Sequence, residues 1–239
     1  MSAIDPEELL LAYRLGIFPM AESRVSTDVL WIRPRERGIL PLEKFHVPRR
    51  LARTIRNDRY QVRVDTAFGA VIRGCAESGP GRGDTWINRA IIDVFELLHD
   101  RGIAHSVEAW EDGELIGGVY GLSLGGAFFA ESKFSRRTDA SKVALVHLAA
   151  RLKSGSYLLL DAQFPNPHLA QFGAIAVSER RFEKLLEKAL ETEADFYRFG
   201  GAVTGAAGAT AGAGVAAAGI AAGGLTAGSS VLQVITHTS

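Results

Sequence analysis

Three strand-like runs in the middle of the chain, separated by two short glycine turns, restrict the possible folds more than any other feature. The runs cover 105–110, 115–123 and 127–132, and the connecting segments 111–113 and 124–126 each end in glycine. Glycine adopts the positive φ that tight hairpin turns require. The spacing therefore predicts three consecutive antiparallel strands joined as a meander.

Helical patterns surround this meander. A helix over 140–153 stops at Gly155 and leads into an apolar strand-like run over 157–163, and a short strand is predicted at 62–64. Other helices are predicted over 65–76, with Asp65 as N-cap, over 88–101 and over 179–190. We interpret this order as an α/β (α+β) fold with a mixed, partly antiparallel sheet, not as a doubly wound parallel sheet.

The N-terminal segment begins with helix signals and then becomes irregular. Asp5 is placed as an N-cap and Pro6 at the first helical position, and Gly16 follows as a stop signal. Proline-punctuated sequence without a clear period comes next. We therefore expect a small N-terminal domain over 1–40 and a main domain over 41–198.

The segment after Arg198 contains no Asp, Glu, Lys or Arg and is dominated by alanine and glycine. An uncharged stretch of this length is long enough to cross a bilayer, but its small residues bury little apolar area and glycine disfavours a stable helix. We therefore expect an Ala/Gly-rich flexible tail over 199–239 and no membrane contact. Its more apolar tip, residues 231–235, is a candidate for docking on the main domain.

Charge is unevenly distributed along a chain whose formal net charge is zero. Between Trp31 and Arg63 there are ten Lys or Arg against three Asp or Glu, a local excess of seven positive charges. Such a block suits a polyanionic partner such as a nucleic acid, because neutralising phosphates is the general source of nucleic-acid affinity. A solvated basic face is the other interpretation of the charge pattern.

The single cysteine, Cys75, has helical spacing to Phe68 and Ile72, which predicts core packing and not catalysis. One cysteine permits neither an intrachain disulfide nor a Cys-based zinc site, which fits a reducing cytoplasm. The N-terminus lacks the basic and apolar regions of a secretory signal. We therefore expect a cytoplasmic protein.

The run over 157–163 combines apolar residues with two polar side chains. Its period of two places Asp161 and Gln163 on one face. A buried carboxylate is costly unless it is paired, and the Gln163 side-chain amide is the nearest candidate donor to Asp161. A turn-capping network is the alternative interpretation of these two residues.

Several motifs in series are specific enough to indicate a family. They are Tyr13–Pro19, Trp86–Asn88, Leu98–His99, Ala104–Trp110, Leu115–Gly121, Glu131–Arg136, Asp139–Lys142 and Leu160–Gln163. In order and spacing they resemble the leucyl/phenylalanyl-tRNA-protein transferase family over about residues 9–190. The resemblance implies an aminoacyltransferase that moves Leu or Phe, and less readily Met, from tRNA to the N-terminal amine of proteins beginning with Arg or Lys. The product carries an N-degron for bacterial proteolysis.

The resemblance also implies a fold, namely a GNAT-like N-acyltransferase domain preceded by a small N-terminal domain. The expected partners are aminoacyl-tRNA and an acceptor protein, and the protein is expected to be a monomer without cofactor or metal. An aminoacyl ester is already activated, and an α-amine with a pKa of about 7.7 to 8.0 is roughly one-tenth neutral near pH 7. Position and hydrogen bonding should therefore matter more than a strong base.

The family pattern assigns roles to four polar residues. Asp161 and Gln163 form the implied catalytic pair, in which Asp161 accepts from the Gln163 amide and the Gln163 carbonyl receives a proton from the amine. Glu131 and Asn166 are the implied acceptor-binding residues, and a carboxylate at Glu131 suits a cationic side chain. A strand-end salt bridge is the other interpretation of Glu131. Lys133, where the family tends to have an apolar residue, is placed to compete for its charge.

The remaining implied groups bind the donor. An apolar pocket for the aminoacyl side chain is expected from residues that pattern alone assigns to the core, Val119, Leu145, Leu148, Leu152 and Leu160. Trp86 is expected to stack on the terminal adenosine, with Met20 in the position of a second aromatic. The helix after Pro48 is expected to bind tRNA phosphates through Arg49, Arg53 and Arg56.

Two other function classes remain open on the sequence. An acyl-CoA-dependent N-acetyltransferase would need a glycine-containing loop that opens a helix and cradles a pyrophosphate, but residues 121–126 lie in a predicted hairpin. A non-catalytic RNA-binding protein built on the basic block would tolerate the loss of Asp161 and Gln163. The sequence has no Walker-type loop, histidine metal cluster or internal repeat, and His99 and His105 are interpreted as core or turn residues.

Overall fold

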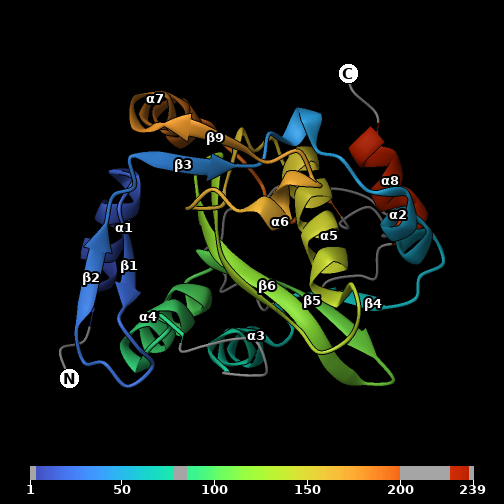
Figure 1. Ribbon diagram of the computed structural model, residues 1–239, viewed down its shortest axis with the longest axis horizontal. Helices are drawn as coiled ribbons and strands as arrows, with labels where there is room; N and C mark the ends of the chain where they lie inside the picture. The colour runs from blue at the N-terminus through green and yellow to red at the C-terminus, as the bar shows by residue number, and fades with distance from the viewer. Residues whose placement is uncertain (1–3, 78–84, 200–226, 237–239) are drawn as a thin grey trace, which may run out of the picture.

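A computed structural model describes residues 4–77, 85–199 and 227–236 of the chain (Figure 1). A seven-stranded mixed sheet forms its centre, with the strand order β4-β5-β6-β7-β8-β3-β9. In that order the strands are β4 (Gln61–Val64), β5 (Ala104–Glu111), β6 (Glu114–Leu124), β7 (Ala127–Ser135), β8 (Leu159–Asp161), β3 (Glu36–Ile39) and β9 (Ile175–Ser178). A second sheet pairs β1 (Phe18–Ala21) with β2 (Val29–Ile32) in antiparallel fashion.

The predicted meander is confirmed. Strands β5, β6 and β7 pair antiparallel in sequence order, and both hairpin turns contain glycines with positive φ, Gly113 at 82° and Gly125 at 53°. Strand β8 then joins β7 in parallel, and the remaining pairs are antiparallel. The sheet is therefore mixed and partly antiparallel, as the sequence predicts.

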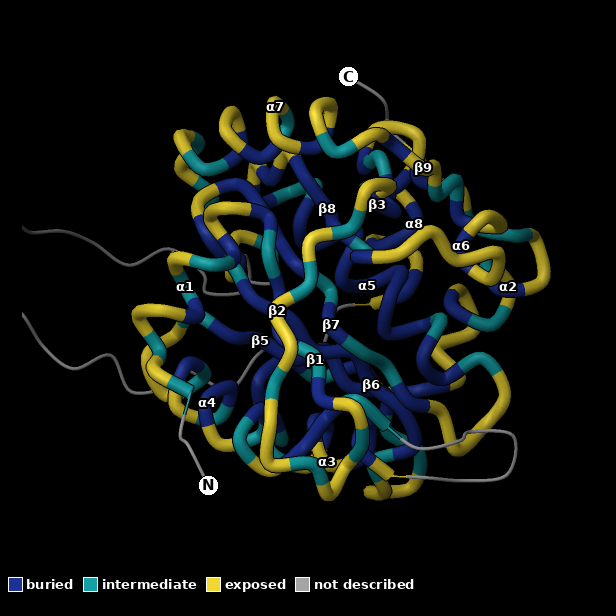
Figure 2. Tube along the Cα trace, turned by 60° about the vertical axis from the view of Figure 1, so that its left-hand side comes forward, coloured by how far each residue is buried: buried dark blue, intermediate teal, exposed yellow. Residues whose placement is uncertain are grey.

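The helices divide between two core clusters that lie on opposite faces of the sheet. One cluster includes residues of α1 (Pro6–Arg14), α3 (Phe68–Ala76), α4 (Arg89–Asp100) and α7 (Glu179–Leu190). The other includes residues of η1 (Leu42–Lys44), α2 (Arg49–Arg56), α5 (Ala140–Ser154), α6 (Pro167–Ala170) and α8 (Gly228–Thr236). The alternation along β7 shows the division, because Phe128 belongs to the second cluster and Phe129 to the first. Figure 2 shows the buried residues concentrated along the sheet and the inner sides of the helices.

Local signals explain most helix ends. Helix α7 has the predicted bounds, and α5 ends at the predicted Gly155. Asn88 caps α4 by accepting from the Ile91 amide at 2.9 Å. Asp5 caps α1 by accepting from the main-chain amides of Glu7 and Glu8. Each cap satisfies amide groups that the first helical turn leaves unpaired. The predicted core position of Cys75 is also confirmed, because it is buried on α3.

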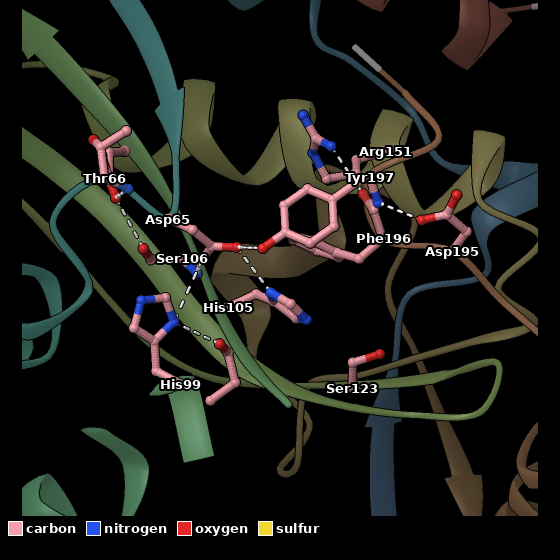
Figure 3. A network of polar contacts seen from close by, with 12 residues as sticks. Asp65, Thr66, His99, His105, Ser106, Ser123, Arg151, Asp195, Phe196 and Tyr197 are labelled. Carbon is pink, nitrogen blue, oxygen red and sulfur yellow. Dashed lines mark hydrogen bonds and ion pairs between the residues drawn. The ribbon is translucent and has the colours of Figure 1, made fainter. Parts of the chain in front are cut away.

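Asp65 is not a helix cap, which corrects the prediction for 65–76. Helix α3 begins at Phe68, and Asp65 is buried with a φ of 55°. Its carboxylate accepts from His105 Nδ1 at 2.8 Å, the Ser106 amide at 2.6 Å and the Tyr197 hydroxyl at 2.5 Å (Figure 3). Donors that only the tertiary fold brings close to Asp65 bind its carboxylate, in place of the helix amides that a local cap would bind. This network holds the end of the main domain against β5 and places His105 in the core, as expected.

The N-terminal region, whose prolines and irregular pattern predicted no strand, contributes one strand to the central sheet. Strand β3 lies between β8 and β9, so part of the predicted 1–40 domain is built into the central sheet. Ile39 pairs with Asp161, and Glu36 pairs with Ser178. Both partners are more than one hundred residues away along the chain, so no local pattern reveals the pairing.

The end of the predicted flexible tail is structured. Residues 200–226 and 237–239 lie outside the described part of the chain, but 228–236 form α8, which packs on α2 and α5. Val231, Leu232 and Ile235 are buried there, and the Gly228 amide donates to Asp58 Oδ1 at 2.7 Å. The apolar tip therefore docks on the domain, as expected. None of the described helices has the length and hydrophobicity needed to cross a membrane.

Candidate active site

A β-bulge in β7 presents Glu131. Tyr120 of β6 pairs with Ser132 and the next residue, Gly121, pairs with Ala130, so Glu131 is an extra residue without a partner in the ladder. A bulge changes the direction of its side chain relative to the regular alternation of the strand. Glu131 is thereby turned toward the end of β8, where it meets Gln163.

Asp161 forms a buried ion pair with Arg37 of β3. The guanidinium donates two hydrogen bonds to the carboxylate, from Nε at 2.9 Å and from Nη2 at 2.6 Å. Both side chains are almost fully buried, at 1% and 0% exposure. The arginine also donates to the Gly16 carbonyl at 2.9 Å and lies between the rings of Phe18 and Phe182. This bidentate geometry meets the requirement that a buried carboxylate be paired.

The hydrogen bonds of Gln163 differ from the predicted ones. Its main-chain amide, not its side chain, donates to Asp161 Oδ1 at 2.9 Å, and its side-chain Nε2 donates to Glu131 Oε2 at 2.8 Å. The prediction that the Gln163 side chain is the donor to Asp161 is corrected, because Arg37 supplies two stronger, charged donors. Gln163 has a φ of 63°, and its carbonyl accepts from the Gly38 amide at 2.9 Å. Its side chain is therefore fixed through both its backbone and its amide group.

Glu131 is a buried acid with an altered protonation equilibrium. Burial raises the pKa of Glu131 to about 8. The nearby Tyr13 hydroxyl and the Gln163 amide oppose this rise, and the Asp161 charge adds to it. Among the described residues, no hydrogen-bond partner is found for Glu131 Oε1 or for the hydroxyl groups of Tyr13 and Tyr120. Near neutral pH, the protonated carboxyl group therefore prevails in the folded protein.

A cavity of about 280 Å³, which we call the reaction cavity, lies beside Gln163 and Glu131. It brings together five of the predicted residues, Val119, Glu131, Leu145, Gln163 and Asn166. Its other lining residues are Leu40, Ala130, Ser132, Lys133, Ala162, Phe164, Pro165 and Leu169. The lining thus combines aliphatic side chains with residues that carry carboxyl, amide and ammonium groups.

Three residues predicted for the aminoacyl pocket lie elsewhere. Leu148, Leu152 and Leu160 do not line the reaction cavity, and each is at most 1% exposed in the core cluster that also contains Val119 and Leu145. Leu148 and Leu152 follow Leu145 by one and two turns of α5, so only the first leucine of this stripe reaches the cavity.

Lys133 and Asn166 complete the polar part of the cavity wall. Lys133 lies on β7 directly opposite Val119, two residues after Glu131. Asn166 caps the short helix α6, and its side chain accepts from the His168 amide at 2.9 Å. A positive charge, a neutral amide and the Glu131 carboxyl group therefore share one opening.

The residues predicted to bind the terminal adenosine are not part of the cavity wall. Trp86 and Met20 are both half-buried, and the Trp86 carbonyl accepts from the amide of Ala21, the residue after Met20, at 3.0 Å. This bond places the two predicted residues in neighbouring segments. Strand β1 also approaches the cavity, because the Phe18 ring packs edge-on against Phe164 with centroids 5.6 Å apart.

Arg49, Arg53 and Arg56 are exposed on α2, whereas Leu51 and Ile55 are buried on its other side. The arrangement agrees with the predicted basic side of this helix, away from the core. Among the described residues, no group of three or more His, Cys, Asp or Glu side chains is placed to hold a metal ion. Residues 121–126 lie in β6 and the following turn, so they do not open a helix.

Sequence reasoning missed Arg37, which holds Asp161 in place. Its position in the basic block between Trp31 and Arg63 favoured an exposed, phosphate-binding role. No sequence signal marks this role, because β3 has only four residues and its last three are all buried, so the strand shows no alternation from which a buried position could be predicted.

Sequence comparison supplies the family. A family described as leucyl/phenylalanyl-tRNA protein transferase matches residues 39–187, and the N-terminal domain of the same family matches residues 2–35. The chain belongs to the leucyl/phenylalanyl-tRNA-protein transferase family. It is therefore an enzyme of the aminoacyltransferase class. The boundary between the two matches falls within β3.

Curated relatives carry the same family name. The chain is 54% identical to the leucyl/phenylalanyl-tRNA–protein transferase of Phenylobacterium zucineum over 209 residues, which cover 87% of this chain and 95% of the relative. It is 55% identical to that of Caulobacter vibrioides over 203 residues, covering 85% and 94%. It is 57% identical to that of Rhodopseudomonas palustris over 195 residues, covering 82% and 87%.

Proposed function

We propose that this enzyme transfers Leu or Phe, and less readily Met, from aminoacyl-tRNA to the N-terminal α-amine of proteins that begin with Arg or Lys. The product would carry an N-degron for bacterial proteolysis, in the cytoplasm where charged tRNA is available. The family match supports the reaction class. The observation that carries the proposal is the Gln163 amide, which is held at the wall of a cavity lined by both apolar and polar side chains.

The chemistry requires positioning more than activation. The amine nitrogen attacks the ester carbonyl carbon, the C–O bond to the tRNA ribose breaks, the amine loses a proton and the ribose oxygen gains one. Because Nε2 of Gln163 donates to Glu131, the amide carbonyl of Gln163 is the group that can accept from the incoming amine. A fixed acceptor of this kind orients the nitrogen lone pair and supplies the effective concentration on which intramolecular rates depend.

Asp161 acts through Gln163 in this proposal. Its carboxylate is neutralised by Arg37 and accepts the Gln163 main-chain amide, so it fixes the backbone from which the reactive amide projects. Asp161 thus still positions Gln163 in this proposal, but it bonds the main-chain amide of Gln163 and not the side-chain amide. Asp161 and Arg37 are positioning residues.

Glu131 and Asn166 are proposed to bind the acceptor. A cationic side chain beside Glu131 would favour its charged form and lower its raised pKa. Acceptor binding should then release a proton from Glu131 near neutral pH. Lys133 in the same wall opposes a cationic acceptor by like-charge repulsion, which would weaken binding of Arg and Lys acceptors relative to a wall with an apolar residue there.

The donor side chain is proposed to occupy the aliphatic part of the reaction cavity. Val119 and Leu145 line the cavity directly. The other predicted residues, Leu148, Leu152 and Leu160, lie behind them in the same packed core cluster. An aliphatic wall accepts Leu, Phe and Met but leaves the polar atoms of a hydrophilic side chain unpaired. Trp86 and Met20 are proposed to pack on the terminal adenosine, and Arg49, Arg53 and Arg56 to bind phosphates of the acceptor stem.

The mixed sheet with a bulged central strand is compatible with the proposed GNAT-like architecture. The residues described here do not favour an acyl-CoA-dependent reaction on such a fold, because the glycine-rich segment 121–126 forms a strand and a hairpin turn. A loop at a helix N-terminus would be needed to bind a pyrophosphate with backbone amides.

A transfer assay tests the proposed function. Purified protein is mixed with tRNA charged with labelled Leu, Phe, Met or Val, and with peptides that differ only in an N-terminal Arg, Lys or Ala. We expect transfer of Leu and Phe, slower transfer of Met, none of Val, and transfer only to Arg and Lys peptides. Absence of transfer from every charged tRNA, with turnover of acetyl-CoA in its place, would refute the proposal.

A further inference from the structure

A second cavity lies directly beside the reaction cavity and has a similar volume, about 280 Å³. The two cavities share lining residues of the segment that follows β8, Ala162, Phe164, Pro165, Asn166 and Leu169. The far wall of the second cavity is the start of β9, with residues 174–176, and Gly38 of β3. The shared segment therefore forms a ridge with one cavity on each side.

The second cavity is apolar in composition. Apart from Asn166, its lining consists of glycine, alanine, proline, phenylalanine, leucine and isoleucine, and no charged side chain contributes to it. Two large apolar side chains on its rim are substantially exposed, Phe164 at 44% and Ile175 at 41%. Single exposed apolar residues are ordinary, but a pair on the rim of an apolar cavity marks a surface suited to an apolar ligand group.

The walls of this cavity are held by the same bonds that fix the reaction cavity. The Gly38 amide donates to the Gln163 carbonyl, and the Ala162 amide donates to the Gly38 carbonyl, each at 2.9 Å. Gly38 has no room for a Cβ, because the Phe164 carbonyl group packs directly against it. The ridge is therefore preformed, which lowers the entropy cost of binding.

The position of the ridge suggests which group enters the second cavity, given the proposed function. If the acceptor α-amine lies at Gln163, the acceptor chain can run outward along the ridge, because Gln163 lies within the segment that forms it. In an extended peptide successive side chains point to opposite sides, and neighbouring Cα atoms are about 3.8 Å apart. A chain that runs along the ridge thus directs its first side chain toward the reaction cavity and its second toward the second cavity.

We propose that the second cavity binds the side chain of the acceptor's second residue and favours an apolar side chain there. The cavity is large enough for one leucine or phenylalanine side chain. A charged second residue would lose water without gaining an ionic partner, which is costly. The enzyme would then read two acceptor residues, a cationic first one and an apolar second one.

Peptides that differ only at the second position test this inference. Otherwise identical acceptors begin with Arg-Phe, Arg-Leu, Arg-Asn or Arg-Asp, and arginine amide serves as the acceptor without a second residue. Leu and Asn side chains have the same branched shape and the same number of heavy atoms, so this pair tests chiefly polarity. We expect kcat/KM to be roughly tenfold higher for Arg-Leu than for Arg-Asn, mainly through KM, and lowest for Arg-Asp.

A pair of matched variants assigns the preference to the cavity. Ala176 lines the second cavity and is exposed, whereas Ala170, also exposed, lines neither the reaction cavity nor the second one. Ala176→Phe should fill the cavity and abolish the preference for Arg-Leu, with arginine amide turned over as before. Ala170→Phe should leave the preference intact.

The outcomes separate this inference from the function on which it rests. Transfer to arginine amide with equal kcat/KM for all four peptides would overturn the second-residue site alone. Persistence of the Leu preference in Ala176→Phe would place the site elsewhere and would also overturn it. No transfer to any acceptor, arginine amide included, would refute the proposed function and the inference with it.

Discussion

Two buried carboxyl groups occur within one short hydrogen-bonded path, and their surroundings differ. Asp161 receives two bonds from the Arg37 guanidinium, whereas Glu131 receives one from the neutral Gln163 amide. A charged partner offsets the loss of water that burial imposes on a carboxylate, and a neutral amide offsets much less of it. Gln163 connects the two groups, through its main chain to one and its side chain to the other. The residue that is proposed to meet the amine is therefore held between an ionised acid and a neutral one.

The raised pKa of Glu131 predicts a pH-dependent effect of Glu131→Gln on stability. The folded-state pKa of about 8 lies above the ordinary value of 4.5, so the native protein retains a proton that the unfolded chain loses as the pH rises between those values. The wild type should lose stability over this range, and the neutral amide should not. Urea unfolding should be measured for both proteins at pH 5 and pH 8. From pH 5 to pH 8, the free energy of unfolding of Glu131→Gln should rise relative to that of the wild type by on the order of a few kcal/mol. A constant difference between the two pH values would contradict the buried, neutral acid.

The Arg37–Asp161 pair predicts a large cost for removing one partner. Arg37→Met leaves the Asp161 carboxylate buried without its two charged donors, and this should lower the free energy of unfolding by roughly 3 to 5 kcal/mol. The double variant Arg37→Met with Asp161→Leu leaves no unpaired charge of this pair and should be more stable than Arg37→Met alone. Equal losses in both variants, measured by urea unfolding, would mean that the ion pair is not what the single substitution disrupts.

Among the described elements, α8 is the one that lies wholly beyond the family match. The family match ends at residue 187, yet α8 buries three apolar side chains against α2 and α5. Its first residue sits so close to the Ile55 carbonyl that only glycine fits, and its amide bonds Asp58 at the end of α2. The helix therefore supports α2 from the side opposite its exposed arginines.

Loosening α8 should expose α2 to solvent exchange. Leu232→Ala removes a buried side chain and should weaken docking of α8 by roughly 2 kcal/mol or more. Hydrogen–deuterium exchange should then accelerate in α8 and α2 but not in α4, which lies on the other face of the sheet. Gln233→Ala, at an exposed position of the same helix, is the matched control and should leave the exchange rates of both α8 and α2 unchanged. Unchanged exchange in α2 would show that α8 does not support it.

The sequence anticipates elements whose signals are local. The amphipathic pattern of α7 and the glycine turns around β6 gave the observed bounds closely, because period, caps and turns are read within a few residues. Strand β3 and the role of Arg37 escaped, because both depend on partners more than one hundred residues away. The predicted Asp65 cap was wrong for a related reason, since donors 40 and 132 residues away, on His105 and Tyr197, bind its carboxylate in place of local helix amides. Family motifs identified Glu131 and Gln163, but only the coordinates show that the two bond each other.

At the scale of the whole molecule, the reaction cavity and the exposed arginines of α2 lie on different elements, as the two proposed kinds of binding require. The reaction cavity lies where β6, β7, α5 and the segment after β8 meet, and it combines aliphatic and polar walls. The exposed arginines of α2 belong to a different element that packs beside α5. A large anionic ligand can thus be held by one surface while a small reactive group reaches the cavity. Because the net charge is zero, the exposed arginines of the basic block between Trp31 and Arg63 are the proposed source of attraction for a nucleic acid, whereas Arg37 of the same block is buried and paired with Asp161.

The basic side of α2 predicts a reduced salt dependence of tRNA binding when its arginines are removed. Arg49→Ala with Arg53→Ala removes two potential phosphate contacts, so the slope of log K against log salt should become shallower by about 1.4 to 1.8. Filter binding or fluorescence titration at several salt concentrations measures it. Arg101→Ala, an exposed arginine that pairs with Glu7 on the opposite face of the sheet, is the control and should leave the slope unchanged. An equal slope in wild type and double variant would exclude α2 from the tRNA surface.

Single-turnover transfer by Gln163→Ala tests most directly whether a fixed amide positions the attacking amine. With saturating charged tRNA and an Arg peptide, the variant should transfer Leu roughly 100-fold more slowly than wild type, while its affinity for the charged tRNA changes less than about twofold. The Gln163→Glu variant, which keeps the length of the side chain, should fall between the two. A wild-type rate in Gln163→Ala would contradict the account, as would a loss of tRNA affinity as large as the loss of rate.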